Sequence, residues 1–288
     1  MSTTPPYPVS VIILTKDEEI NITSCLDHLA FSDDIVVYDS LSTDKTTQLA
    51  QSHPRVGSSV RIVSRKFDNW SAHQNWAVQN IAFKHPWVLY VDADEHVTPE
   101  LASELQRLAD PASAVSAYRL RRKDHLMGRW LRHAQLYPSW FVRFFRPAKI
   151  KWERLVNPVA VVDGPLEQLE GHLMHYPFSK GITQWLERHN SYSSFEAQEL
   201  LKVLGGTKRE PLSGLFSSDP TIRRAVLKNI FFRLPLRPQI KWIYYVFWRM
   251  AWLDGAPGMT YARLTYLYEY MISIKAKELL AKRDQNPE

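Results

Sequence analysis

Cysteine is almost absent from this chain and glycine is scarce: its 288 residues include one Cys, Cys25, and ten Gly. A single thiol excludes both an intramolecular disulfide framework and a cysteine-based zinc site. No Gly-x-Gly-x-x-Gly follows the first apolar run, which argues against a dinucleotide site, and the lack of Gly-x-x-x-x-Gly-Lys-Ser/Thr excludes a P-loop. Because Cys25 falls in an amphipathic helical stretch, we expect a buried, unreactive thiol.

Long apolar runs are absent as well. No stretch reaches the roughly 18 uninterrupted apolar residues that a membrane-spanning helix needs. The nearest is residues 240–253, which Lys241 and Arg249 interrupt and which is rich in Trp and Tyr. Aromatic rings flanked by cations suit the headgroup layer of a membrane, so we expect the C-terminal helices to contact a membrane surface. The alternative is a buried aromatic helix packed on the main domain.

The N-terminal residues 1–8 are polar and rich in proline, without the apolar segment of a secretory signal. We therefore expect a cytoplasmic protein, peripheral on the inner face of the plasma membrane. The formal charge of +6 favours anionic partners, but it does not distinguish nucleoside diphosphates, nucleic acid and anionic lipids. With 45% hydrophobic and 23% charged residues, the composition permits a sizeable globular core.

The first hundred residues alternate between short β-branched runs and helical patterns. The apolar runs predict strands at residues 9–14, 35–38, 60–63 and 87–91. Helical spacing predicts helices over residues 18–30, 42–52 and 71–83, and Thr98-Pro99 is typical of a further helix start. Strands that alternate with helices predict an α/β fold, with a mostly parallel sheet covered by helices.

The second half of the chain changes character. We predict a strand at residues 115–122, then an irregular region at 125–180 with short strands at 141–145 and 159–162. Helical patterns dominate from Gly181 onward, and the Gly, Pro and Ser content of residues 205–220 predicts a loop. We therefore divide the chain into an α/β domain at residues 1–180 and a helical C-terminal region at 181–288.

Ligands of an open α/β sheet bind beyond the carboxyl ends of its strands. The residues that follow the predicted strands are mostly acidic or hydroxylic: Thr15–Glu18, Asp39-Ser40, Ser64–Lys66 and Asp92–Asp94. Asp92 and Asp94 follow a buried strand two residues apart, so both carboxylates can turn toward one hard cation. Mg²⁺ or Mn²⁺ held in this way keeps open positions for phosphate oxygens. Turn capping is the alternative for this pair.

Three other residues near these strand ends have two interpretations each. Asp39 stands where a carboxylate can accept hydrogen bonds from a ribose or a base, or where an Asx turn leads to Ser42. Glu18 is either a nucleotide contact or a first-turn acid that complements a helix dipole. His73, in the third helical stretch, is either a contact to the base or a structural histidine.

Several short motifs together identify a family. They are Val11–Glu19, Ile35–Ser40, Ser42–Thr46, Phe67–Trp76, Val91–Glu95, Gly128–Trp130, Tyr137-Pro138, Arg143–Arg146, Val162–Pro165 and Leu253–Gly255 with Gly258. With them the chain resembles the inverting family 2 glycosyltransferases of GT-A fold, and among these the bacterial branch that includes lipopolysaccharide core glucosyltransferases. The resemblance covers nearly the whole chain.

The resemblance implies a role for individual residues. Thr15, Glu18, Asp39 and the pair Gln74-Asn75 would hold the nucleotide, within a donor and metal region at residues 9–110. The metal, Mg²⁺ or Mn²⁺, would be held by Asp92 and Asp94. His175 stands where GT-A enzymes can supply a further metal or phosphate contact, and a structural histidine is the alternative. Residues 115–180 would form the acceptor side.

The chain departs from the family pattern at two places. The branch often carries Lys or Arg where Gln74 stands, so a cationic contact to the donor is either missing or supplied by Lys66. The branch also places a Glu, its presumed base, where this chain has Pro158, which cannot take a proton. An inverting transfer needs a general base near the acceptor hydroxyl. Glu153 is our first choice, with Asp94 as the other catalytic residue, while Asp163 and Asp124 are alternatives to Glu153.

The predicted activity is metal-dependent transfer of a hexose from a nucleoside diphosphate sugar, a UDP-sugar by resemblance alone. The expected acceptor is a bacterial envelope glycan or a lipid-linked saccharide, and no nucleic acid partner is expected. A nucleotidyltransferase is one alternative, although residues 15–19 lack the Gly-rich basic loop that such enzymes carry. A catalytically inactive glycan- or membrane-binding protein is the other, and Pro158 is the feature that favours it.

Overall fold

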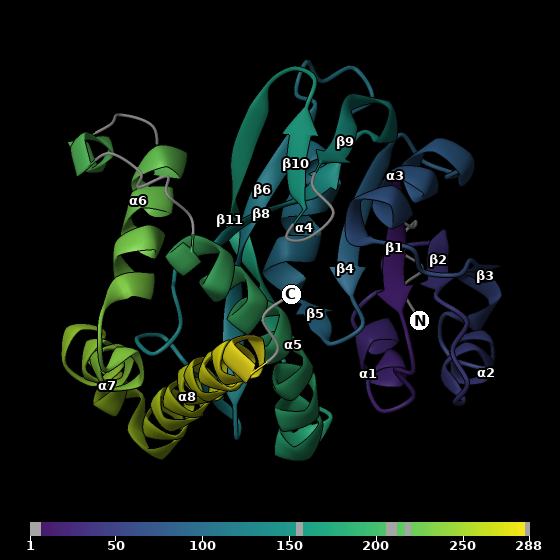
Figure 1. Cartoon of the computed structure of the whole chain (residues 1–288). Helices are drawn as coiled ribbons and strands as arrows, with labels where there is room; N and C mark the ends of the chain where they lie inside the picture. The colour runs from purple at the N-terminus through teal and green to yellow at the C-terminus, as the bar shows by residue number, and fades with distance from the viewer. Residues whose placement is uncertain (1–6, 154–157, 206–211, 217–219, 286–288) are drawn as a thin grey trace. The chain divides into compact units, whose positions relative to one another are not determined.

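The computed structural model describes residues 7–153, 158–205, 212–216 and 220–285 (Figure 1). The chain folds as two compact units. The first contains Met1–His125 and Leu136–Ser179, and the second contains Leu126–Gln135 and Lys180–Glu288. Each unit has buried apolar clusters of its own.

The first unit is built on a sheet with the strand order β3-β2-β1-β4-β8-β6-β11-β5. Its strands are β1 (Val9–Thr15), β2 (Ile35–Asp39), β3 (Val60–Ser64), β4 (Trp87–Asp92), β5 (Glu95–Val97), β6 (Ala117–Leu126), β8 (Trp140–Phe145) and β11 (Leu166–His175). The first four strands pair in parallel, and β11 is parallel to β6. Antiparallel β8 separates β4 from β6. The mostly parallel sheet that the sequence predicts is confirmed.

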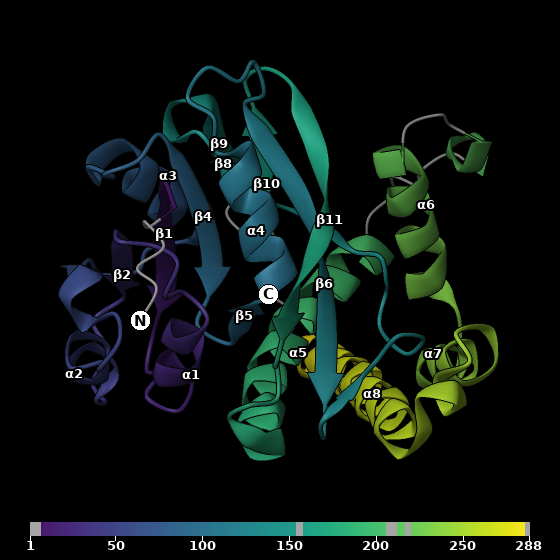
Figure 2. The same cartoon turned by 180° about the vertical axis from the view of Figure 1, so that it is seen from behind.

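Helices and a small hairpin complete this unit. The helices are α1 (Ile22–Asp27), α2 (Thr46–Gln51), α3 (Trp70–Asn80) and α4 (Pro99–Leu108), with 3₁₀ turns η1 (Gly57–Ser59) and η2 (Pro147–Lys149). β9 (Ile150–Glu153) and β10 (Val159–Val162) form a separate antiparallel pair. Figure 2 shows α4 and the long strands β6 and β11 from the second viewpoint.

Alternate residues of the central strands enter two different cores, as expected for a sheet covered on both faces. Val11 and Ile13 pack in the cluster that contains residues of α1 and α4. Ile12 packs on the opposite face with Ala77 of α3. Cys25 of α1 is fully buried in the first cluster, which confirms the prediction of a buried thiol. The predicted strand positions and the start of α4, which Thr98 caps, are confirmed as well.

The strand order places a topological switch beside β1. The chain runs outward through β2 and β3 on one side of β1, and then pairs β4 with the other side. The carboxyl ends of β1 and β4 therefore flank the crevice where ligands of such sheets bind. Thr15 ends β1, and Asp92 ends β4 opposite Leu14.

The first two helices are shorter than their apolar patterns predict. α1 begins only at Ile22, because residues 18–21 form a turn whose Glu18 N–H donates to Thr46 Oγ1 at 2.7 Å. α2 begins only at Thr46, since the carboxylate of Asp44 accepts a hydrogen bond from the Thr46 N–H at 2.9 Å. Local side-chain hydrogen bonds thus replace a first helical turn in both places.

Strand β11 occupies ten residues that the sequence left irregular. Its burial does not alternate, because only Leu169, Leu173 and His175 are buried. A register shift between Gln168 and His172 interrupts its pairing with β6. The period of two that identifies a half-buried strand is therefore missing from its sequence. The predicted strands at residues 141–145 and 159–162 correspond to β8 and β10.

The second unit is helical. It contains β7 (Arg129–Trp130), α5 (Gly181–Gly205), η3 (Leu212–Phe216), α6 (Pro220–Arg233), α7 (Arg237–Ile243), the π-helical turn η4 (Tyr244–Trp248), η5 (Ala251–Asp254) and α8 (Gly255–Gln285). The helical prediction from Gly181 is confirmed. Of the predicted loop at 205–220, residues 206–211 and 217–219 lie outside the described residues. No helix in the described part of the chain is long and apolar enough to cross a membrane.

Side-chain clamps hold the second unit together. The buried Asp254 accepts hydrogen bonds from the backbone N–H groups of His133 and Ala134, both at 2.8 Å, and its other oxygen lies 2.9 Å from the His133 ring. The carboxylate of Glu269 on α8 accepts from Arg237 and Lys241, both at 2.7 Å. These two buried acids therefore fix residues 126–135 and α7 against the rest of the unit.

Candidate active site

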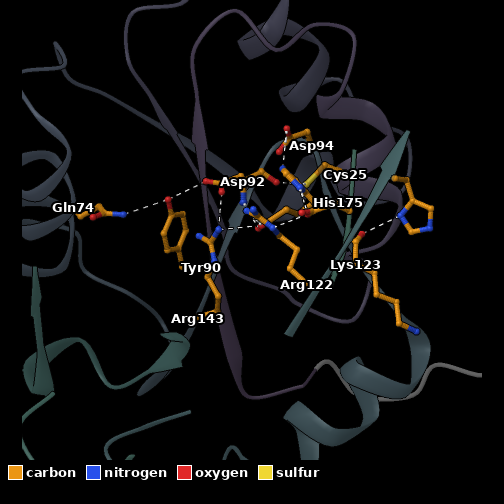
Figure 3. A network of polar contacts seen from close by, with 12 residues as sticks. Cys25, Gln74, Tyr90, Asp92, Asp94, Arg122, Lys123, Arg143 and His175 are labelled. Carbon is orange, nitrogen blue, oxygen red and sulfur yellow. Dashed lines mark hydrogen bonds and ion pairs between the residues drawn. The ribbon is translucent and has the colours of Figure 1, made fainter. Parts of the chain in front are cut away.

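A continuous network of charged groups lies at the carboxyl end of β4 (Figure 3). The Asp92 carboxylate accepts a hydrogen bond from the Tyr90 hydroxyl at 2.9 Å on one oxygen and from Arg143 at 2.6 Å on the other. Arg143 comes from β8 and also donates to Glu95 at 3.0 Å. Arg122 of β6 lies 3.4 Å from the same oxygen of Glu95. Antiparallel β8 and its neighbour β6 thus deliver two arginines beneath the Asp92–Glu95 segment.

Glu95 is the most deeply buried acid of this network. Its side chain is inaccessible to solvent, and one carboxylate oxygen accepts from the backbone N–H of Asp92 at 2.9 Å. Burial raises the pKa of Glu95, although Arg143 opposes that effect. The hydrogen bond to the Asp92 N–H fixes the turn that follows β4. Glu95 and Arg143 belong to two of the family motifs, Val91–Glu95 and Arg143–Arg146, but neither was predicted to be a site residue.

Asp92 is ionised and paired. Burial alone would raise the pKa of its carboxyl group, but the charge and hydrogen bond of Arg143 outweigh burial and hold the pKa below its ordinary value. The pKa of Arg143 is raised well above its ordinary value, because attraction to Asp92 and Glu95 outweighs the burial of the guanidinium. Asp92 still reaches solvent, with 32% of its side chain exposed.

Asp94 and His175 form the other end of the network. The Asp94 carboxylate lies 3.4 Å from Nε2 of His175, and Nδ1 of His175 lies 2.6 Å from Asp124. Burial lowers the pKa of His175, but the hydrogen bonds to Asp124 and Asp94 outweigh it, so the pKa rises to about 9. At neutral pH the imidazole is therefore protonated and donates to both carboxylates. The Asp94 side chain is 24% exposed and therefore reaches solvent.

The chemistry of these groups suits a hard divalent cation only in part. Carboxylate oxygens are the ligands that Mg²⁺ prefers, and Asp92 and Asp94 both reach solvent. Three cations (Arg122, Arg143 and protonated His175) already offset most of the negative charge there. Among the described residues, no group of three or more acids, histidines or cysteines is arranged to hold a metal ion. A protonated imidazole has no free lone pair, so a cation would have to displace a proton before His175 could bind it.

The residues predicted to hold a nucleotide lie at the ends of β1 and β2. Thr15 Oγ1 donates to the buried carboxylate of Asp39 at 2.9 Å, and the Ser42 N–H donates to the same carboxylate at 2.8 Å. This second bond comes from the residue three positions on, not two as in an Asx turn, but it gives Asp39 a local structural role next to Ser42. The Glu18 carboxylate accepts from the Asn21 side-chain amide at 2.7 Å, but Glu18 precedes α1, whose first turn contains no acid, so it is not the first-turn acid considered as its alternative. The structure thus brings Thr15 and Asp39 together.

Helix α3 joins this region to the Asp92 network. Gln74 donates to the Tyr90 hydroxyl at 3.3 Å, and through Tyr90 it contacts Asp92. The Gln74 amide oxygen is buried, and no described residue hydrogen-bonds to it. The side-chain amide of its neighbour Asn75 donates to the Trp152 carbonyl oxygen at 2.8 Å and accepts from the Trp152 N–H at 2.7 Å. Gln74 therefore has an acceptor to offer a ligand, whereas Asn75 ties α3 to β9.

His73 and Lys66 have different surroundings. The His73 ring stacks on Tyr38, with ring centroids 4.1 Å apart, and its nitrogens lie 3.3 Å from Ser40 Oγ and 3.1 Å from Arg65. Burial and the Arg65 charge lower the pKa of His73 to about 4, so the ring is neutral. Lys66 follows β3 and is exposed. The structure therefore places His73, but not Lys66, in contact with the β2 end.

Glu153, the predicted general base, ends β9. Its side chain is 56% exposed and forms a surface ion pair with Lys151 at 2.9 Å. Among the described residues no contact joins Glu153 to Asp92 or Asp94. Residues 154–157, including Asn157, lie outside the described residues. Of the alternatives, Asp124 is held by Arg122 and His175, and Asp163 pairs with Lys149 at the surface.

The profile of glycosyl transferase family 2 matches residues 10–164, more than half of the chain. The chain belongs to glycosyl transferase family 2. As a family 2 member it is a glycosyltransferase, and the predicted GT-A class of fold is confirmed. The match includes every network residue named above except His175.

Similar proteins are known from several bacteria. This family 2 chain is 22% identical to the lipopolysaccharide core biosynthesis glycosyltransferase LpsC of Rhizobium meliloti, over 94% of this chain and 92% of LpsC. It is 25% identical to an uncharacterized glycosyltransferase of Rickettsia typhi, over 67% of this chain and 68% of that protein.

Solved structures resemble the chain more distantly. The match to TarS 1–349 of S. aureus covers 96% of this chain and 91% of the TarS chain, with a TM-score of 0.44 and 14% identity. The mannosyltransferase PcManGT of Pyrobaculum calidifontis, in complex with GDP-Man and Mn²⁺, has a TM-score of 0.47 and 16% identity, over 95% of this chain and 88% of its own.

Proposed function

We propose that this glycosyltransferase moves a hexose from a nucleoside diphosphate sugar to a saccharide hydroxyl, with inversion and with the help of a divalent metal ion. One observation carries the proposal. Two carboxylates that reach solvent, Asp92 and Asp94, lie at the topological switch of the sheet. Buried charged groups hold them there: Arg143 contacts Asp92, and His175 contacts Asp94. Such crevices bind nucleotides in open α/β folds, and paired aspartates there suit a metal–diphosphate pair.

Asp94, with Asp92 beside it, would hold the metal ion, Mg²⁺ or Mn²⁺. That ion would offset the negative charge that builds on the departing diphosphate. Because Arg122, Arg143 and protonated His175 already offset most of the carboxylate charge, the cation site alone is weakly negative. The diphosphate of the donor supplies the missing negative charge. Metal and donor are therefore expected to bind together, each strengthening the affinity for the other.

The unpartnered oxygen of Gln74 supports a donor site on the same side of the sheet. A buried acceptor without a donor costs free energy, roughly 1–3 kcal/mol, which a ligand hydroxyl or N–H would recover. Thr15 and Asp39 present further oxygen atoms at the ends of the adjoining strands. A UDP-sugar is the donor that the family resemblance implies.

In a single displacement, the acceptor oxygen forms a bond to the anomeric carbon as the bond from that carbon to the diphosphate breaks. A general base takes the proton of the acceptor hydroxyl. We propose Glu153 for this role, because Asn75 ties β9 to the donor-side helix α3 through Trp152. The likeness to LpsC along 92% of that protein supports a saccharide of the lipopolysaccharide core as the acceptor.

Titration calorimetry with UDP- and GDP-sugars, with and without Mn²⁺, tests the donor and metal assignments. The wild-type chain is expected to bind one donor at least tenfold more tightly with Mn²⁺ than without it, which corresponds to about 1.4 kcal/mol of coupling. Asp94→Asn is expected to lose this Mn²⁺-dependent increase in donor affinity, because it removes the negative charge of the side chain proposed to bind the metal. Asp163→Asn, a change in an exposed carboxylate paired with Lys149, is the matched control and keeps it.

Equal metal-dependent affinity in a folded Asp94→Asn variant would contradict the metal assignment. Release of UDP in the presence of a lipopolysaccharide core acceptor measures turnover. Glu153→Gln is expected to lower kcat about 10²- to 10⁴-fold with little change in donor affinity. Turnover that is unaffected by this substitution would assign the base elsewhere.

A further inference from the structure

The run from α7 into η4 exposes apolar side chains where a surface helix ordinarily exposes polar ones. Exposed residues recur there at helical spacing: Leu236, Ile240, Ile243, Tyr244, Phe247 and Trp248. Trp248 is 79% exposed and Phe247 is 67% exposed. A helix of this position usually places its apolar face toward the core and its charges toward water. Here the apolar face is on the outside.

The charged residues of the same run face inward. Arg237 is buried and, together with Lys241, hydrogen-bonds to the buried carboxylate of Glu269. Arg249 donates at 3.0 Å to the carbonyl oxygen of His133 and also donates to that of Gln135. These cations are therefore used to hold the second unit together. The outward direction of the apolar residues is a consequence of this fixed packing.

Further exposed apolar residues follow directly, at Met250, Trp252 and Leu253. We call these three and the six residues before them the apolar stripe. Its nine members fall within 18 residues, yet they are a third of the 27 large hydrophobic side chains exposed anywhere in the described part of the chain. Single exposed apolar residues are ordinary, whereas a concentration of this kind marks an interaction surface.

The charge around the apolar stripe points to the chemistry of its partner. Residues 220–277, between Asp219 and Glu278, contain ten Lys or Arg and only two acids, although Arg237, Lys241 and Arg249 are already paired inside the unit. Both acids, Asp254 and Glu269, are buried and hydrogen-bonded inside the unit. No acidic side chain of this stretch is therefore left at the surface to repel an anionic partner. Arg223 and Arg263 are exposed cations of the same stretch.

We propose that the apolar stripe is a docking site for the surface of an anionic phospholipid bilayer. Trp and Tyr side chains favour the headgroup layer, and Ile, Leu and Phe favour the acyl boundary just beneath it. Phosphates of the lipid headgroups complement exposed cations of this stretch such as Arg223 and Arg263. The stripe belongs to a short, interrupted run that lies along the surface of its unit, which suits binding on a bilayer rather than insertion across it. The proposal concerns only the second unit and does not depend on the proposed transfer reaction.

Vesicle sedimentation with the full-length protein tests the proposal. Vesicles of phosphatidylcholine alone are compared with vesicles that also contain phosphatidylglycerol, at low and at high salt. The wild-type chain is expected to sediment with the anionic vesicles, and raised salt is expected to weaken this binding. The double variant Phe247→Ala, Trp248→Ala is expected to lower the partition coefficient at least about tenfold. It lacks the two aromatic rings whose transfer from water into the bilayer interface favours binding.

A matched control is available in the same unit. Phe195 of α5 is 67% exposed, as Phe247 is, but it is not a member of the apolar stripe. Phe195→Ala is expected to leave vesicle binding unchanged, and circular dichroism checks that each variant is folded. Failure of the wild-type chain to bind anionic vesicles, or equal binding by the double variant, overturns the proposal. A wild-type dimer that the double variant splits, seen by light scattering without lipid, would also overturn it and assign the stripe to a second copy.

Discussion

At the scale of single residues, Arg143 decides how much charge the candidate site can hold. It is the one cation that contacts both Asp92 and the fully buried Glu95 in the described structure. Without it, Asp92 and Glu95 would face each other across a buried turn. The network therefore depends on a residue 51 positions away from Asp92, which β8 brings between β4 and β6.

Replacing this arginine tests its role. Arg143→Met is expected to lower the free energy of unfolding by about 3 kcal/mol at neutral pH, because a buried charge pair loses one partner. The loss should be larger at higher pH, since Glu95, whose pKa burial already raises, must then ionise with only the more distant Arg122 in contact with it. Urea unfolding at two pH values measures both effects. Adding Glu95→Gln to the variant should recover part of the loss, and a double variant as unstable as the single one would contradict the explanation.

His175 gives the stability a pH dependence. Its pKa is raised from 6.5 to about 9 by Asp124 and Asp94, which outweigh its burial. A group whose folded pKa is raised contributes stability that is complete below pH 6.5 and is lost as the pH rises through 9. We expect the free energy of unfolding to fall by on the order of 3 kcal/mol across this range when metal is removed with EDTA. His175→Gln should flatten the curve there, and parallel curves for the two proteins would refute the assignment.

At the scale of secondary-structure elements, the sequence predicts strands most reliably where the strand is buried on both faces. β1, β2 and β4 are almost fully buried, so their β-branched runs and polar ends identify them, and with them the position of Asp92 and Asp94. β11 lacks any such pattern and was missed. The arginine support of the site was missed for another reason: it depends on β8 inserting between β4 and β6, a pairing that residue patterns do not encode.

The segment that Asp254 holds offers a test at this scale. Asp254→Ala leaves the buried N–H groups of His133 and Ala134 without their acceptor, so we expect a loss of about 2–4 kcal/mol in the free energy of unfolding. Chemical denaturation measures it. The control is Asp163→Ala, which removes a carboxylate that is 79% exposed and is expected to change stability by no more than about 0.5 kcal/mol. Similar losses in both variants would contradict this account of the clamp.

At the scale of the whole molecule, the chain is two compact units with separate buried clusters. The residues of the candidate site all belong to the first unit, and the apolar stripe belongs to the second. The family match ends at residue 164, so it covers most of the first unit, which contains the candidate site, and leaves most of the helical unit outside it. The sequence predicted an α/β domain at residues 1–180 and a helical region at 181–288, but it did not indicate which side of the aromatic helix is exposed.

Calorimetry can detect this division. Because each unit has its own core, we expect two unfolding transitions rather than one. A donor with Mn²⁺, at about 100 times its Kd, should stabilise only the first unit, by about 2.7 kcal/mol. Asp254→Ala should lower only the transition of the second unit. A single transition that both changes move equally would show that the units unfold together.

The π-helical turn η4 sets the helical phase of the rings that end the apolar stripe. A turn of this kind contains one residue more than an α-helical turn, and each residue of a helix rotates the next side chain by about 100°. Deleting a single residue between Tyr244 and Trp248 would thus leave an ordinary α-helical turn and keep Arg249 in phase with the residues before it. Inserting a further residue there would instead rotate Arg249 by about 100°, away from the carbonyls that it holds.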